Sequence, residues 1–450
     1  MSEVDVVVLG LGPGGEAAAT RLAQAGLEVV GIDRRLVGGE CPYYGCIPSK
    51  MAIRAANLLA EGRRIPGRAG RSEVYADWEP VATRIRDEAT TDWDDTAAVE
   101  RLEKAGVTFV RGHGRLTAEA TVEVDGRSFH ARRGVVLNTG TEPAAPSVPG
   151  LADSPFWTNR EALRADTLPA SLIVIGGGAI GAELAQAFAR FGVAVTIVEA
   201  AERILAADEP EASAAVAEAF DRDGIAIHTA ARVEKVDHAE GRFTVRTDTA
   251  TLEAERLLVA TGRRPNLADV GLDAVGLDPE ARAIEVDAWM RAADRLWAIG
   301  DITGKGAFTH VSMYQADVAV RDLLDQGGPA ADYRAVPRVT FTDPEVGAVG
   351  MTEQQARDAG VRVRTGRAPL SSSARGWIHG AGNDGVVKLV EDADAGVLVG
   401  ATAVGPSGGE VLGLLTAAVH ARVPVATLRS MIYAYPTFHR TVEAALDDLG

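Results

Sequence analysis

The chain has 450 residues, which is more than one ordinary domain holds and enough for roughly two to four. Hydrophobic residues make up 46% and charged residues 24%, as in a soluble globular protein. The formal net charge of -17 argues against nucleic acid or an anionic membrane as a partner, because both attract Lys and Arg. We find no signal peptide and no apolar run that could span a membrane, so we expect a cytoplasmic location.

The chain opens with a predicted strand, glycine turn and helix. The valine-rich run 4–10 predicts a buried parallel strand, and "GLGPGG" places Gly10, Gly12 and Gly15 at G-x-G-x-x-G spacing before a helix at 16–26. The first glycine permits the turn, the second lets a pyrophosphate approach the backbone, and the third packs helix against strand. Asp33 ends the next strand, where an acid can bind ribose hydroxyls, so this segment predicts a dinucleotide site.

Both cysteines of the chain, Cys41 and Cys46, lie in "GGECPYYGCIPSK". A disulfide needs Cα atoms roughly 4.4–6.8 Å apart, so a bond between them requires a sharp turn, which Pro42 and Gly45 can supply. A helix is predicted to begin close to Cys46, and its N-terminus and the nearby Lys50 would favour the Cys46 thiolate. Structural zinc needs about four ligands, so a redox-active pair explains the spacing better.

The strand–glycine–helix pattern occurs a second time in residues 171–199. Gly176, Gly178 and Gly181 have the same spacing, and Glu199 ends the second strand. Each unit is followed by a strand, a Thr-Gly pair and a proline-bearing turn, with Gly140 in the first exit and Gly262 in the second. Two dinucleotide sites beside a redox disulfide suggest an electron path from one dinucleotide through a flavin to the cysteines.

The remaining chain predicts a return to the first fold and then a new one. "RLWAIGDITGKG" predicts a strand and turn that contain Gly300 and Asp301, and residues 310–326 predict a helix. From about residue 335, alternating runs and helices indicate a separate domain with an antiparallel sheet. We therefore predict an α/β chain with two Rossmann-like dinucleotide-binding domains and a C-terminal α+β domain.

In these motifs the chain resembles the flavin-dependent pyridine nucleotide–disulfide oxidoreductases, the family of dihydrolipoamide dehydrogenase, glutathione reductase and mercuric reductase. The cysteine segment resembles the family's redox-disulfide signature, "GLGPGG" and "AIGDITG" resemble its FAD motifs, and "TFTDPEVGAVGMTE" resembles the start of its dimer-interface domain. The resemblance implies an FAD domain in residues 1–150 and 267–335, an NAD domain in 151–266 and an interface domain in 336–450. It also implies a homodimer whose active site is shared between chains.

The resemblance further implies roles for individual residues. Cys46 would be the thiol next to the flavin, and Cys41 would meet the substrate. Lys50 and Glu183 would form an ion pair beside the flavin, where negative charge develops on reduction. The implied cofactor-binding residues are Gly10, Gly12, Gly15, Asp33, Gly140, Gly300 and Asp301 for FAD, and Gly176, Gly178, Gly181, Glu199 and Gly262 for the nicotinamide nucleotide.

Glu199 also bears on the choice of nicotinamide nucleotide. A carboxylate at this place accepts a hydrogen bond from a ribose 2′-hydroxyl and repels a 2′-phosphate. No arginine lies beside it in the sequence, and Arg203 is the closest. We therefore expect NADH to be preferred over NADPH.

The C-terminus departs from the family pattern. Members that act on disulfides carry a histidine and a glutamate in "HPTxSE" as their acid–base pair, but the stretch here is "YPTFHR", which places Tyr435 at the histidine position and Arg440 at the glutamate position. A tyrosine hydroxyl is a poor base at neutral pH. His439 and Glu443 are four residues apart, so they could rebuild the pair on one helix face, or lie on a solvated face or an interface.

Three functions follow as hypotheses. The first is an NAD(P)H-dependent flavoprotein that acts on a disulfide-type or other thiol-reactive small molecule. The second is an NAD(P)H:quinone or metal-ion reductase in which the flavin passes electrons directly to the acceptor. Mercuric reductases carry a tyrosine at the position of Tyr435, but this chain lacks their C-terminal cysteine pair. Tyr43 and Tyr44 could form a wall for a quinone, or pack in the core. The third is a dihydrolipoamide dehydrogenase-like component of a larger complex.

Overall fold

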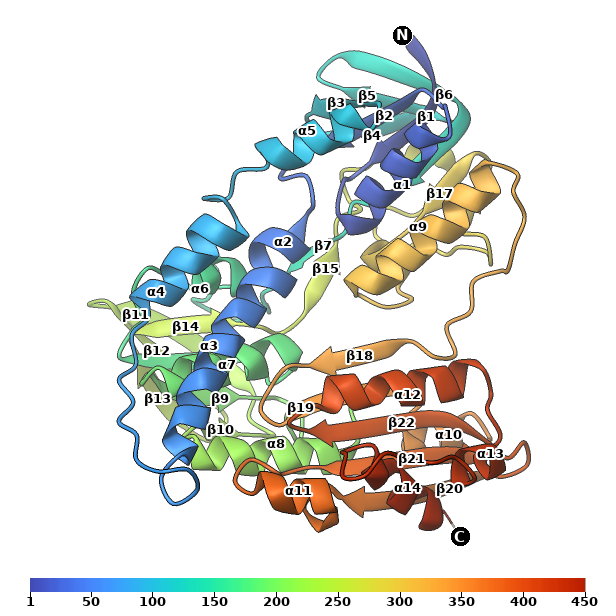
Figure 1. Cartoon of the computed structure of the whole chain (residues 1–450). Coiled ribbons are helices and arrows are strands. Elements are labelled where there is room, and N and C mark those ends of the chain that lie inside the picture. Colours follow the sequence, from blue (N-terminus) through green and yellow to red (C-terminus); the bar gives the residue numbers. More distant parts are fainter. Residues whose placement is uncertain (450) are drawn as a thin grey trace. The chain divides into compact units, whose positions relative to one another are not determined.

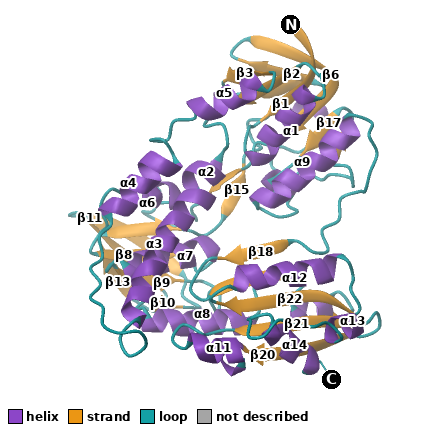
Figure 2. Ribbon diagram, in the orientation of Figure 1, coloured by secondary structure: helices purple, strands orange, loops and turns teal. Residues whose placement is uncertain are grey.

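The computed structural model describes residues 1–449, which group into two compact units (Figure 1). Unit 1 comprises Met1–Pro48, Arg84–Pro143 and Arg263–Tyr333. Unit 2 comprises Ser49–Thr83, Ala144–Gly262 and the described residues from Arg334 onward. Both units mix helices and strands (Figure 2), and no helix in residues 1–449 has the length and apolar character needed to cross a membrane.

A largely parallel sheet forms the centre of unit 1. Its strands run in the order β16-β17-β6-β1-β2-β3, and a hairpin of β4 and β5 adds to β6. The register places Val7 of β1 opposite Val30 and Val135. The strands are β1 (Ser2–Leu9), β2 (Val29–Asp33), β3 (Val107–Arg111), β4 (Arg115–Ala118), β5 (Thr121–Val124), β6 (Arg127–Leu137), β16 (Arg291–Ala293) and β17 (Leu296–Ala298).

Both faces of this sheet are covered, which explains the unbroken valine run in β1. Val6 and Val8 face helices α1 (Pro13–Gln24), α5 (Thr96–Lys104) and α9 (Thr309–Leu323), whereas Val7 and Leu9 face the layer that includes the hairpin. Helices α1 and α9 lie side by side (Figure 1). A parallel strand buried on both faces reads as a continuous apolar run rather than an alternating one.

A second parallel sheet, in unit 2, repeats the strand order of the first. Its order β10-β9-β8-β14 corresponds to β3-β2-β1-β6, and α7 (Ala179–Arg190) follows β8 as α1 follows β1. This repeat confirms the prediction of two Rossmann-like folds. The further elements are β8 (Ser171–Ile175), β9 (Ala194–Val198), α8 (Pro210–Arg222), β10 (Ala226–His228), β14 (Arg256–Val259), and an antiparallel sheet of β11 (Val233–Ala239), β12 (Arg242–Thr247) and β13 (Thr251–Ala254).

The C-terminal part of unit 2 is an antiparallel sheet covered by helices, as predicted. Its strands run in the order β18-β19-β22-β21-β20, and α12 (Gly408–His420) and α14 (Arg440–Asp447) pack on the face that holds Val387 and Leu389. Lys388 lies between these two residues, so its side chain points to the opposite face. The strands are β18 (Pro337–Thr340), β19 (Glu345–Gly350), β20 (Val363–Pro369), β21 (Val386–Asp392) and β22 (Val397–Gly405).

Further helices and short strands hold the two cysteines and the residues that directly follow Gly140 and Gly262. Helices α2 (Glu40–Tyr44) and α3 (Cys46–Arg64) contain the two cysteines, and β7 (Thr141–Pro143) pairs with β15 (Arg263–Pro265) as a two-stranded ribbon in unit 1. Helix α3 begins at Cys46, as the sequence predicted. The other α-helices are α4 (Glu79–Thr83), α6 (Asn159–Arg164), α10 (Glu353–Asp358), α11 (Ala374–His379) and α13 (Val425–Arg429).

Candidate functional site

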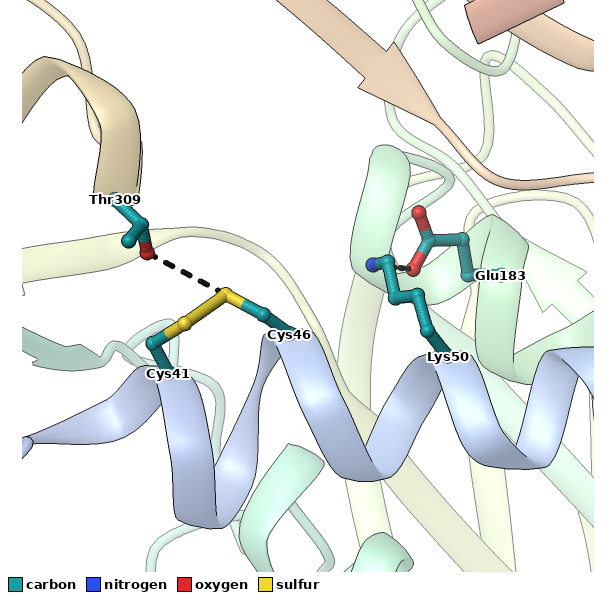
Figure 3. Close-up of a disulfide and its surroundings, with 5 residues drawn as sticks. All are labelled: Cys41, Cys46, Lys50, Glu183 and Thr309. Atoms are coloured by element: carbon teal, nitrogen blue, oxygen red, sulfur yellow. Dashed lines mark hydrogen bonds and ion pairs between the residues drawn. A yellow bond between two sulfur atoms is a disulfide. The ribbon is translucent and has the colours of Figure 1, made fainter. Parts of the chain in front are cut away.

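Cys41 and Cys46 form a disulfide where α2 meets α3 (Figure 3). Their Cα atoms are 4.8 Å apart, within the range that a disulfide requires. Gly45 separates the two helices, and a Cβ at this position would lie 3.3 Å from the carbonyl oxygen of Glu40. The tight turn between the cysteines therefore favours glycine, which explains part of the spacing of the motif.

The sulfur of Cys46 lies 3.4 Å from the hydroxyl oxygen of Thr309 (Figure 3). Thr309 is the first residue of the 15-residue helix α9. A hydroxyl at a helix N-terminus can donate a hydrogen bond to a thiolate, and the helix dipole there favours negative charge. Sequence reasoning missed Thr309, although its place close after the Gly300–Asp301 motif was an available signal.

The glycine loop of unit 1 has the shape that a dinucleotide pyrophosphate requires. A Cβ at Gly15 would strike the carbonyl oxygen of Gly10, and a Cβ at Gly10 would strike that of Asn138. At Gly12 the nearest neighbour would be only the side-chain amide of Asn138, 3.2 Å away. No side chain caps the N-terminus of α1, and the helix dipole there favours the negative charge of a phosphate. These residues fit FAD.

Asp33 holds this loop in place from the end of β2. Its carboxylate accepts hydrogen bonds from the backbone N–H groups of Leu11 and Arg35, each at 2.7 Å. Burial raises the pKa of Asp33 above its ordinary value, although the two hydrogen bonds act in the other direction. The side chain that was predicted to bind a ribose therefore also fixes the turn that would receive the pyrophosphate.

Three further residues of the expected FAD site come together in unit 1. Asp301 accepts a hydrogen bond at 2.7 Å from the hydroxyl of Thr141, which directly follows Gly140. The backbone N–H of Gly300 donates to Gln315 at 2.6 Å. Sequence reasoning did not single out Thr141, and its only signal was its place beside Gly140 in the exit motif.

The glycine loop of unit 2 repeats this construction. A Cβ at Gly181 would strike the carbonyl oxygen of Gly176, whereas a Cβ at Gly178 would meet no atom within 4 Å. Glu199 accepts hydrogen bonds from the backbone N–H of Gly177 at 2.6 Å and of Ala201 at 2.7 Å, which matches the arrangement of Asp33. Gly262 accepts a hydrogen bond from the backbone N–H of Ala144. These residues fit a second dinucleotide.

Lys50 and Glu183 form an ion pair within unit 2 (Figure 3). The ammonium nitrogen lies 2.7 Å from the carboxylate, whose side chain is only 6% exposed. The second carboxylate oxygen accepts a hydrogen bond from the backbone N–H of Phe341 at 2.8 Å, and the ammonium lies over the Phe341 ring. Glu183 is thus fixed from two sides, and it fixes Lys50.

Tyr435 and His439 lie in the segment before α14. Tyr435 is 71% exposed, and the guanidinium of Arg440 lies 5.5 Å from its ring centre. The carboxylate of Glu443 pairs with Arg440 at 2.7 Å. The structure therefore gives Glu443 an arginine partner, and within residues 1–449 no hydrogen bond or ion pair links Tyr435 or His439 to Lys50 or Glu183.

Tyr43 packs into unit 1 rather than forming an open wall beside the cysteines. Its side chain is buried, its ring is tilted against that of Tyr44, and its carbonyl oxygen accepts a hydrogen bond from the Trp93 indole at 3.1 Å. Burial, together with the charge of Asp95, raises the pKa of Tyr43 to about 12. For Tyr43, core packing is the better explanation.

Comparison with known proteins agrees with this geometry. Residues 4–321 match the family model "Pyridine nucleotide-disulphide oxidoreductase", and residues 336–446 match its dimerisation domain. The chain is 35% identical to the dihydrolipoyl dehydrogenase of Halobacterium salinarum, over 99% of this chain and 96% of that protein. It is 32% identical to the mercuric reductase of Bacillus cereus, over 99% and 71% of the two chains.

Solved structures show the same similarity over the whole chain. The Cu(II) complex of the HOCl-induced flavoprotein disulfide reductase RclA from Escherichia coli superposes with a TM-score of 0.87 at 26% identity, over 99% of both chains. LpdA from Mycobacterium tuberculosis gives 0.87 at 27% identity, over 100% of both. The dimerisation domain supports a homodimer. The chain therefore belongs to the FAD-dependent pyridine nucleotide–disulphide oxidoreductase family and is an NAD(P)H-dependent enzyme.

Proposed function

We propose that the enzyme takes electrons from NADH and delivers them through the Cys41–Cys46 pair to a thiol-reactive small molecule. The observation that carries this proposal is the disulfide itself, held with Cys46 against Thr309 at the N-terminus of α9. Bound FAD and NADH would supply the hydride chemistry. The glycine loops, with Asp33 and Asp301 in one fold and Glu199 in the other, would bind the two dinucleotides.

The side chains around the pair would then have distinct tasks. Thr309 would stabilise Cys46 as a thiolate after reduction, which leaves Cys41 as the thiol that attacks the acceptor. Lys50 would keep a positive charge one helical turn beyond Cys46, and Glu183 would hold its ammonium in one position. We also propose the domain boundaries predicted from the sequence and an active site shared between the two chains of a homodimer.

The preference for NADH rests on two side chains of unit 2. Glu199 stands at the end of β9, where its charge would repel a 2′-phosphate. Arg203, the nearest arginine in the sequence, donates its hydrogen bonds to the backbone carbonyls of residues 205, 206 and 208 at 2.8–3.0 Å. These bonds hold the guanidinium to its own loop, so it is not placed to neutralise a 2′-phosphate.

A second candidate acceptor is a thiophilic metal ion, and Tyr435 favours it. Reduction of a disulfide substrate needs two protons to pass from the enzyme dithiol to the leaving thiolates, whereas a metal ion takes up only electrons and the two protons of the dithiol go to solvent. A tyrosine in place of a histidine base hinders the first reaction more than the second. Among similar proteins, one is named a mercuric reductase and another was solved as a Cu(II) complex.

The test is to replace Cys41 with Ser and measure NADH-dependent turnover with disulfides, Cu(II), Hg(II) and quinones. We expect the variant to retain FAD and to lose turnover of the true acceptor. Turnover that survives replacement of both cysteines would contradict it and would indicate direct transfer from the flavin.

A further inference from the structure

An acid that the proposed reaction does not use lies directly before the first cysteine. Glu40 is the first residue of α2, and its carboxylate lies 3.2 Å from the guanidinium of Arg263. The two side chains are 28% and 20% exposed, so water screens the pair only partly. Such a pair restrains its two segments more strongly than a fully exposed pair does.

Arg263 is itself held firmly by the ribbon of β7 and β15. Its Nε donates to the hydroxyl of Thr141 at 2.8 Å, and its Nη2 donates to the Thr141 carbonyl at 2.9 Å. The Thr141 hydroxyl in turn donates to Asp301. A continuous series of polar contacts within unit 1 therefore links Glu40 through Arg263 and Thr141 to Asp301, the acid that we expect to bind FAD.

These polar contacts matter most when the disulfide is open. The S–S bond holds Cys41 to Cys46 in the oxidised form, but reduction removes that restraint from α2, a helix of only five residues. The ion pair at Glu40 then remains as a tie next to Cys41. A thiol that is kept close to its partner re-forms the disulfide more readily, because less freedom is lost on closure.

We propose that Glu40 is a positioning residue for the redox pair: its ion pair with Arg263 keeps Cys41 close to Cys46 in the dithiol and so favours the disulfide. The inference rests on the proposed function for the use of the pair in electron transfer. It concerns a thiol–disulfide equilibrium, however, which can be measured without NADH or an acceptor.

The test is to equilibrate the FAD-loaded protein anaerobically with mixtures of reduced and oxidised dithiothreitol. Each Cys41–Cys46 disulfide that opens gains two electrons and two protons from one dithiothreitol, which closes to its ring disulfide. Acid quenching, alkylation and mass spectrometry then give the ratio of dithiol to disulfide. In Glu40→Gln, which keeps the size of the side chain and removes its charge, we expect this ratio to rise about tenfold.

Glu142→Gln is the matched control. Glu142 lies on the same ribbon and pairs with Arg264 at 2.6 Å and with Arg35 at 3.0 Å, but it does not neighbour a cysteine in the sequence. We expect the ratio of dithiol to disulfide in Glu142→Gln to equal that in the wild type. If Glu40→Gln loses FAD or folds poorly, Glu40→Asp against Glu142→Asp gives the same comparison, with an intermediate ratio expected for Glu40→Asp.

A Glu40→Gln ratio equal to those of the wild type and of Glu142→Gln would overturn the inference. Its failure is distinct from failure of the proposed function. If the wild-type pair equilibrates with dithiothreitol and yet stays oxidised while NADH reduces the flavin, the proposed electron path is wrong, whatever Glu40 does.

Discussion

The ammonium of Lys50 lies 2.7 Å from the carboxylate of Glu183. Lys50 lies on α3, the helix that begins at Cys46. Glu183 is nearly buried and is also bound by a backbone N–H group of the C-terminal sheet region, so the position of Lys50 is set by packing rather than by its own flexible stem. A fixed cation of this kind can stabilise charge that develops during electron transfer without first reorganising.

Replacing Lys50 with Met should therefore slow reduction of the enzyme by NADH, by about 100-fold if the cation acts as an electrostatic catalyst. Stopped-flow absorbance of the flavin measures this rate. Arg54→Met is the matched control, because Arg54 is an exposed cation one turn further along α3. Equal slowing in both variants would show that general charge, not the fixed Lys50, is responsible.

Nucleotide choice gives a second prediction. The ratio of kcat/KM for NADH to that for NADPH should exceed about ten in the wild type and fall several-fold in Glu199→Gln, because the charge that repels a 2′-phosphate is removed. Initial rates with each nucleotide measure the ratio. Arg203→Leu should leave KM for NADPH unchanged, and a rise in that KM would mean that Arg203 does reach the nucleotide.

Much of this architecture could be predicted from the sequence, because it depends on local patterns. The spacing of Gly10 and Gly15, and of Gly176 and Gly181, reflects a contact within one turn, because a Cβ at the later glycine would strike the carbonyl oxygen of the earlier one. The separation of Cys41 from Cys46 likewise implied a turn that can close a disulfide. The two Rossmann-like folds and the C-terminal sheet followed from strand and helix periodicity.

The contacts that join distant segments could not be predicted in the same way. Thr309 reaches Cys46 across 263 positions, and Arg263 reaches Glu40 across a similar distance in sequence. Such pairings depend on tertiary packing, which sequence periodicity does not encode.

The ion pairs of Asp343 should make the stability of the fold depend on pH. Its carboxylate lies 2.7 Å from Arg64 and 2.8 Å from the buried Arg190. Burial alone would raise the pKa of Asp343, but the two arginines lower it below its ordinary value. The unfolded chain then binds a proton at higher pH than the native state, so this stabilisation is present above about pH 4 and is lost as the pH falls further.

Asp343→Asn should therefore flatten the loss of stability in acid. Urea unfolding midpoints between pH 6 and pH 3 measure it, and the wild-type midpoint should fall more steeply than that of the variant. Asp384→Asn serves as a control, since the partner of Asp384, Arg222, is half exposed. If the wild type and Asp343→Asn show parallel curves, the arginine pair does not govern acid stability.

Removal of the Lys388 ammonium should greatly lower the stability of the fold. Its ammonium lies 2.9–3.0 Å from three carboxylates, those of Glu209, Glu211 and Glu353, and both Lys388 and Glu209 are almost fully buried. Burial lowers the pKa of Lys388, but the three acids more than offset this and raise it above its usual value. The lysine therefore stays charged, and its removal leaves Glu209 buried without its cation.

Lys388→Met should lower stability by about 3–5 kcal/mol, seen as a fall in Tm by differential scanning calorimetry. Lys235→Met is the control, because Lys235 and its partner Asp237 are both about half exposed and should shift Tm little. A Tm for Lys388→Met equal to that of the control would contradict this account of the cluster.

We expect electrons from NADH to reach the Cys41–Cys46 pair. Anaerobic titration of the FAD-loaded enzyme with NADH, followed by its visible spectrum and by alkylation of the cysteines, tests it most directly. We expect a long-wavelength charge-transfer band after one equivalent of NADH, from a Cys46 thiolate against oxidised flavin, with both cysteines then open to alkylation. Bleaching of the flavin with no such band, and with the disulfide intact, would contradict it.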